Sequence, residues 1–109
     1  MEELKILQKT YDMLQYLYQA MQQYPKAEKY ALAADTKAAA YELLRLLVTA
    51  NKRYHKKTTM QDADIQLDIL RHLIRLGKDL GMMPIKRFEV LSGMTTEIGR
   101  LLGGWMKTI

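Results

Sequence analysis

Three cationic side chains recur at helical spacing in the segment LDILRHLIRLGKDL: Arg71, Arg75 and Lys78. Residues three or four positions apart lie on neighbouring turns of a helix, so these cations would form a continuous basic strip. Guanidinium groups match the geometry of phosphate oxygens, and phosphate contacts position a protein on nucleic acid. The strip therefore predicts a surface that contacts phosphates.

The same polar arc contains carboxylates that could neutralise this strip. Asp68 lies three residues before Arg71, and a further carboxylate, Asp79, lies four residues after Arg75. Such spacings allow ion pairs along one helix, which are typical of a plain solvated face. Alternatively, the aspartates hold the guanidinium groups in place for a phosphate ligand. The sequence leaves both interpretations open.

A second group of cations lies in the run KRYHKK, residues 52–57. Its basic side chains could bind phosphates while Tyr54 stacks on a base. Cations also stabilise the C-terminal end of a helix, so helix capping explains the run equally well. The candidate binding residues in this run are Lys52, Arg53, Lys56 and Lys57.

No residue pattern in the chain predicts an active site. The sequence has no P-loop, no dinucleotide-binding glycine motif, no zinc-protease motif and no nucleophile elbow. It contains no cysteine, and neither His55 nor His72 has a glutamate three residues before it, as di-metal bundles require. We therefore expect a protein that is not an enzyme and that uses no metal or cofactor.

The apolar residues recur every three to four positions and predict an all-α protein. The expected helices span residues 2–23, 26–55, 59–80 and 84–107, with Pro25, Gly81 and Pro84 at the connections. Thr58 and Gln61 have the spacing of a capping box at the start of the third helix. Short connections favour a single domain, residues 1–109, folded as an up-down-up-down four-helix bundle.

The third predicted helix carries more apolar surface than a monomeric bundle needs. Its apolar side chains cover an arc of about 180°, whereas a surface helix typically needs little more than about 100°. Self-association would cover the surplus, although a helix central to its own bundle would have the same pattern. The arc consists of Ile65, Ile69, Leu70, Leu73, Ile74, Leu76 and Leu80, and Leu67 borders it.

Composition limits the compartment and the partners. The chain of 109 residues carries 17 Lys and Arg against 12 Asp and Glu, a net charge of +5, which is compatible with nucleic acid or an acidic protein partner. Its start, MEELKILQKTYDMLQ, is charged and periodic, unlike a signal peptide, and no apolar run is long enough for a membrane span. We expect a cytoplasmic protein.

The last predicted helix contains IGRLLGGWMK, residues 98–107, with three glycines in ten residues. Trp105 continues the core stripe, and Gly99 and Gly103 are four apart, a spacing that allows another backbone to approach closely. Gly104 extends this small surface beside the indole. The sequence thus predicts a packing role for these residues, within the bundle or between subunits, while Arg100 leaves the core stripe and is a candidate for binding.

Three segments together resemble one known family: YPKAEKYALA at residues 24–33, LDILRHLIRLGKDLGMM at 67–83 and EIGRLLGGWMK at 97–107. They are similar to bacterial four-helix-bundle proteins that include Avd, the accessory variability determinant of diversity-generating retroelements. The family also contains proteins encoded within intervening sequences of 23S ribosomal RNA genes. The resemblance covers nearly the whole chain.

The resemblance implies a homopentameric barrel of four-helix bundles with a basic surface. In retroelement members this assembly binds the reverse transcriptase together with template RNA or cDNA and supports mutagenic retrohoming. Arg71, Arg75 and Arg100 match the family's arginine positions and are the expected contacts. Two alternatives remain: an intervening-sequence bundle without a polymerase partner, and a plain oligomerisation module.

Overall fold

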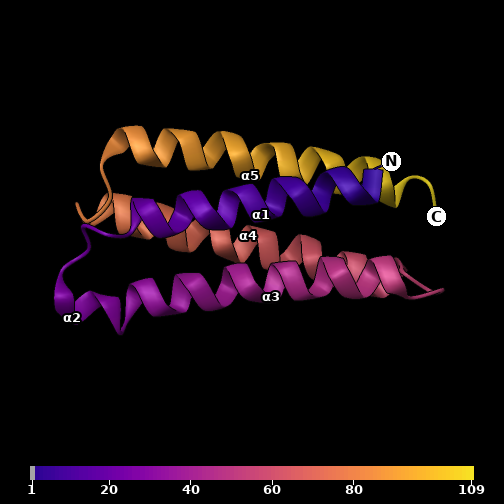
Figure 1. The fold of residues 1–109 in the computed structure, drawn as a ribbon, viewed down its shortest axis with the longest axis horizontal. Coiled ribbons are helices and arrows are strands. Elements are labelled where there is room, and N and C mark those ends of the chain that lie inside the picture. Colours follow the sequence, from indigo (N-terminus) through magenta and orange to yellow (C-terminus); the bar gives the residue numbers. More distant parts are fainter. Residues whose placement is uncertain (1) are drawn as a thin grey trace.

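The computed structural model describes residues 2–109, and almost all of them are helical. Four long helices run α1 (Glu2–Ala20), α3 (Leu32–Lys52), α4 (Lys57–Asp79) and α5 (Ile85–Met106). A single turn, α2 (Lys26–Lys29), precedes α3. Figure 1 shows the long helices side by side in an elongated bundle about 43 Å long.

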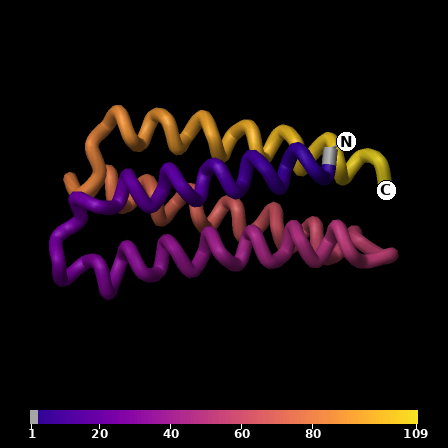
Figure 2. Tube along the Cα trace, viewed as in Figure 1, coloured from indigo at the N-terminus to yellow at the C-terminus, as the bar shows by residue number. Residues whose placement is uncertain are grey.

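Successive long helices run in opposite directions, as the trace in Figure 2 shows. Each of them packs on two neighbours, in the order α1, α3, α4, α5 and back to α1, so the bundle is four-sided. The up-down-up-down arrangement predicted from the short connections is therefore correct. α4 lies between α3 and α5 and faces α1 diagonally across the core.

The structure departs from the predicted boundaries between α1 and α4. α1 ends at Ala20, and the helix expected over residues 26–55 is interrupted at Tyr30–Ala31 and stops at Lys52. α2 buries none of its residues, whereas Leu32 at the start of α3 is buried. Because of this interruption, the chain can pass from the end of α1 to the start of α3, where Leu32 enters the core.

The predicted capping box at the start of the third long helix is wrong. α4 begins at Lys57, two residues before the expected start, so Thr58 lies inside its first turn, and no side chain caps the helix. The other end agrees with the prediction: Gly81 has φ of 78°, a left-handed conformation that terminates α4 after Leu80. α5 runs without interruption through Ser92 and Gly93.

The core is a continuous cluster of Leu, Met, Ala and Ile side chains from all four long helices, closed near one end by Trp105. Its buried threonines do not bond across the core. Thr10, Thr36 and Thr95 each donate their hydroxyl to a carbonyl of their own helix, four residues earlier, at 2.7–3.0 Å. Each hydroxyl is thereby satisfied without a partner from another helix.

Tyr24, in the connection after α1, inserts its ring against Gly77 of α4. The side chain is only 2 % exposed, and a Cβ built on Gly77 would lie 2.0 Å from its hydroxyl oxygen. Within residues 2–109 this hydroxyl has no hydrogen-bond partner, and burial raises its pKa above the ordinary value of 10.0. Position 77 therefore requires glycine, because the Tyr24 side chain occupies the space that a Cβ would need.

Gly77→Ala should destabilise the protein, because the added methyl group displaces the Tyr24 ring. Overpacking of a core costs about 1–3 kcal/mol, which exceeds the gain in helix propensity. Gly93→Ala is the matched control, since nothing lies within 4 Å of its built Cβ. Urea unfolding should show a lower stability for Gly77→Ala and an equal or higher one for Gly93→Ala. Equal stability of the two variants would contradict the packing of Tyr24.

Tyr24→Phe should leave stability at pH 7 unchanged or raise it by about 1 kcal/mol, because an unpaired buried hydroxyl is removed. Since the folded-state pKa of Tyr24 is raised, the unfolded chain loses this proton first as pH rises through about 10, and the wild type loses stability there. Chemical unfolding between pH 8 and 10.5 should show a steeper loss for the wild type than for the variant. Parallel profiles would refute this account.

Candidate nucleic-acid interface

A groove of about 310 Å³ lies between α4 and α5 and contains two of the predicted binding residues. Arg71, His72 and Arg75 of α4 form one wall, and Phe88, Ser92 and Thr95 of α5 form the other. The antiparallel packing of α4 and α5 brings these segments, distant in sequence, to the same height. The groove combines two guanidinium groups, one imidazole, the carboxylate of Asp68, one aromatic ring, the aliphatic side chain of Ile74 and two hydroxyl side chains.

Arg71 is the least neutralised of the predicted cations in this groove. Its expected ion pair with Asp68 does not form: Asp68 instead lies 3.8 Å from Nδ1 of His72. The Arg71 Nη2 donates to Oγ1 of Thr96 on α5, with a long separation of 3.4 Å. No carboxylate lies within 4 Å of Arg71 in the part of the chain that the structure describes. Its guanidinium group is therefore exposed and held towards α5 by a neutral partner.

Arg75 and Lys78 share one carboxylate, that of Asp79. The predicted Arg75–Asp79 pair is present, with Nε 3.5 Å from Oδ2, and Nζ of Lys78 lies 2.7 Å from Oδ1. The hydrogen bond from Lys78, followed by the charge of both cations, holds the pKa of Asp79 below its usual value. Lys78 also lies over the ring of Phe88, with Nζ 4.7 Å from the centroid. These two cations are thus half-compensated, with one negative charge between them.

Arg100 does not line the groove. Its Nε and Nη2 donate to the carboxylate of Glu97 at 3.1 and 2.6 Å. The hydrogen bond from Arg100 is the main cause of the lowered pKa of Glu97, and the charges of Arg100, Lys9 and Lys5 add to it. Both side chains are on the exposed surface of α5, so this pair forms a separate charged feature.

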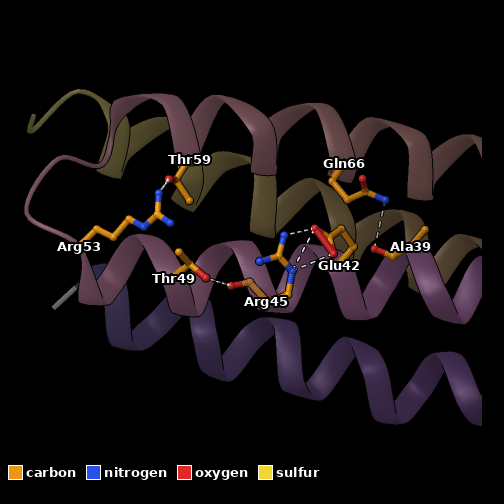
Figure 3. Close-up of polar contacts among 7 residues, drawn as sticks. All are labelled: Ala39, Glu42, Arg45, Thr49, Arg53, Thr59 and Gln66. Atoms are coloured by element: carbon orange, nitrogen blue, oxygen red, sulfur yellow. Dashed lines mark hydrogen bonds and ion pairs between the residues drawn. The ribbon is translucent and has the colours of Figure 1, made fainter.

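The cations of residues 52–57 lie at the far end of α4 from Lys78, roughly 30 Å away along the helix. Lys56 donates its Nζ to the backbone oxygens of Ala50 (2.8 Å) and Arg53, and so caps the C-terminal end of α3. Arg53 reaches Oγ1 of Thr59 at 3.5 Å, as Figure 3 shows. Capping therefore explains Lys56, whereas Lys52 and Lys57 are exposed without a described role.

The glycines of α5 are less confined than expected. A Cβ on Gly99 would lie 3.4 Å from Cδ2 of Leu67, an ordinary contact, and nothing lies within 4 Å of one on Gly103. Gly103 and Gly104 are exposed, while Trp105 is buried. The expectation of a close backbone approach at Gly103 is thus wrong within the chain, because this side of α5 faces outward. Trp105 packs in the core as predicted.

Sequence reasoning missed the α5 wall of the groove. Ser92 and Thr96 are polar residues that lie beside the core stripe of their helix, on the side that faces α4. Phe88, which packs against the core, also contacts Lys78 with its ring. The available signal was the placement of hydroxyl side chains at one border of an apolar stripe. It becomes informative only once the neighbouring helix is known.

Among residues 2–109 no cluster of three or more His, Asp or Glu side chains could hold a metal ion. None of the described helices combines the length and apolarity that a membrane span requires. The fold and the groove thus define a small antiparallel helical-bundle protein with a cationic surface groove. The bAvd-like family model matches residues 4–109, and the chain belongs to that family. No curated protein matches the sequence.

Gly103→Ala should stabilise the chain by about 1 kcal/mol, because alanine has the higher helix propensity and its methyl group meets no atom. Thermal unfolding at a concentration that keeps the protein monomeric would measure this. A lower melting temperature would mean that another segment packs against the backbone at Gly103, a position that the structure of the single chain leaves open.

Proposed function

We propose that the protein is a non-catalytic accessory of a diversity-generating retroelement. It acts in the cytoplasm as a homo-oligomer, a pentamer by family resemblance, and binds the element's reverse transcriptase together with template RNA or cDNA. The polymerase supplies the chemistry of mutagenic retrohoming, and this chain supplies a binding surface. Family membership supports the general role.

The observation that carries the proposal is the state of Arg71. It lies in a groove beside Arg75 and has a threonine instead of a carboxylate as its partner. A guanidinium group with free donors at a groove wall can bind a phosphate at little cost, since no ion pair must first be broken. Ser92 on the opposite wall adds a hydroxyl group that suits the same ligand.

The two remaining cations of the strip favour a ligand of high negative charge. Asp79 compensates only one of the two positive charges of Arg75 and Lys78. A polyanion could replace that carboxylate from Arg75, whose contact of 3.5 Å is the weaker one, while Lys78 keeps its short bond. The strip would then follow a nucleic-acid backbone along α4.

The double variant Arg71→Gln/Arg75→Gln should bind single-stranded RNA about tenfold more weakly at 50 mM salt, because two phosphate contacts are lost. The slope of log K against log salt concentration should fall by about 0.7 for each contact that is removed. Fluorescence anisotropy with a labelled oligonucleotide measures both quantities.

Arg45→Gln is the matched control. Arg45 is an exposed arginine on α3 that is already paired with Glu42, as Figure 3 shows, and it does not line the groove. It changes the net charge by one without touching the strip, so binding should change little. If Arg45→Gln lost half as much binding free energy as the double variant, binding would follow net charge alone, and no loss for either variant would refute a phosphate role for the groove.

The retroelement role is tested by the neighbouring genes and by co-purification. A reverse-transcriptase gene with a template and variable repeat beside this gene, and capture of that enzyme by the tagged protein, are the expected results. A gene located inside a 23S ribosomal RNA intervening sequence, with no polymerase nearby, would overturn the proposal in favour of the other branch of the family.

A further inference from the structure

His72 lines the groove between α4 and α5 beside Arg71 and Arg75, and it does not belong to the core. Its side chain is 70 % exposed. Its Nδ1 lies 2.8 Å from the backbone carbonyl oxygen of Asp68, one turn earlier on α4. A carbonyl oxygen can only accept a hydrogen bond, so Nδ1 must carry a proton. The backbone of α4 thus fixes the tautomer of this imidazole.

The fixed tautomer leaves Nε2 as the nitrogen that a ligand would meet. Both polar contacts of His72 among the described residues, with the carbonyl group and with the carboxylate of Asp68, involve Nδ1. In a neutral imidazole whose proton is on Nδ1, the other nitrogen carries a lone pair and can only accept a hydrogen bond. In its neutral form, His72 therefore contributes an unused acceptor to the groove.

The α4 wall of the groove thus presents donors and acceptors at separate positions. The guanidinium groups of Arg71 and Arg75 donate hydrogen bonds, whereas Nε2 of His72 and the carboxylate of Asp68 accept them. The residues of α5 that line the groove add no charged group. A ligand that fits this wall must bring acceptors for the arginines together with a donor for His72.

The backbones of DNA and RNA differ in how well they meet this requirement. The sugar-phosphate backbone of DNA offers only acceptors, whereas each ribose of RNA adds a 2′-hydroxyl group, which can also donate. His72 lies three residues before Arg75, on the neighbouring turn of the helix, and shares the groove with Arg71. A phosphate bound by these arginines would therefore bring the adjoining sugar to His72.

We propose that His72 distinguishes RNA from DNA in this groove, because its Nε2 accepts a hydrogen bond from a ribose 2′-hydroxyl group next to the phosphate that the arginines bind. The inference rests on the nucleic-acid binding in the proposed function and selects RNA as the preferred ligand. Asp68 is a positioning residue, since its carbonyl oxygen holds Nδ1 and so keeps Nε2 for the strand.

The test compares three single strands that carry the same base: oligouridine, oligodeoxyuridine and 2′-fluoro-oligouridine. The fluorinated strand keeps the sugar pucker of RNA but has no donor at the 2′ position. In fluorescence anisotropy at about pH 8, the wild type should bind oligouridine about fivefold more tightly than either other strand, the usual gain from one hydrogen bond. His72→Phe keeps a ring without nitrogen atoms, so it should bind all three strands alike and oligodeoxyuridine as the wild type does.

His55→Phe is the matched control, since His55 is the other histidine of the chain and does not line the groove. It should keep the preference for oligouridine. Both histidines are exposed, so both variants should fold, which circular dichroism and thermal unfolding verify.

A second measurement uses pH, because a histidine side chain ordinarily changes its charge between about pH 5 and 8. Protonation turns Nε2 from an acceptor into a donor for phosphate oxygens. Oligodeoxyuridine should therefore bind about threefold more tightly to the wild type at about pH 5.5 than at about pH 8. His72→Phe should lose this increase, and His55→Phe should retain it.

The contrary outcomes separate this inference from the proposed function. Equal affinity of the wild type for all three strands, or a preference for oligouridine that survives in His72→Phe, would overturn the role of His72 alone. Tight binding of the fluorinated strand would show that the sugar pucker is recognised instead of a donor, and would overturn it too. If the wild type binds none of the strands, or if Arg71→Gln/Arg75→Gln binds them unchanged, the proposed function fails and this inference fails with it.

Discussion

The end of the bundle where α1 stops and α4 turns into α5 is organised around the missing side chain of Gly77. The ring of Tyr24 fills the space that a Cβ would need, and the carbonyl oxygen of Gly77 accepts hydrogen bonds from the backbone of Met82 (2.9 Å) and Met83 (3.3 Å). One position thus fixes the exit from α1 and the reversal of the chain before α5. The α4/α5 groove depends on it, because that reversal sets which residues of α5 stand opposite Arg71 and Arg75.

Four of the 17 lysines and arginines, namely Arg45, Arg75, Lys78 and Arg100, form ion pairs within their own helix. Arg45 with Glu42 and Arg100 with Glu97 are pairs of this kind, and ion pairs on an exposed helix face contribute little to stability. Their consequence is to remove these arginines from competition for an outside ligand. Within the strip on α4, Arg71 has no carboxylate partner, and Arg75 and Lys78 share one, so this strip keeps a net positive charge.

Periodicity predicted the four-helix fold, the uninterrupted α5, the helix end at Gly81 and the uncovered half of the α4 arc, because each depends on one helix at a time. That half consists of side chains that are 43–59 % exposed, namely Ile65, Ile69, Leu76 and Leu80. It failed at Tyr30–Ala31, where good helix formers are interrupted by the need to bury Leu32, and at Gly77, whose purpose depends on a tyrosine from elsewhere. The basic strip was predictable as a strip. The partners of its cations were not predictable. Thr96, which accepts a hydrogen bond from Arg71, belongs to another helix, and the carboxylate of Asp68 lies near His72 instead of Arg71.

The buried threonines have a consequence for how this bundle can change shape. Thr10, Thr36 and Thr95 satisfy their hydroxyl groups on their own helices, so these groups do not tie one helix to the next. The relative rotation and tilt of the helices are then set by the shapes of flexible Leu and Met side chains, which can repack. Small changes of crossing angle should therefore be energetically inexpensive, and the bundle is suited to adjusting its outer faces to whatever surface it meets.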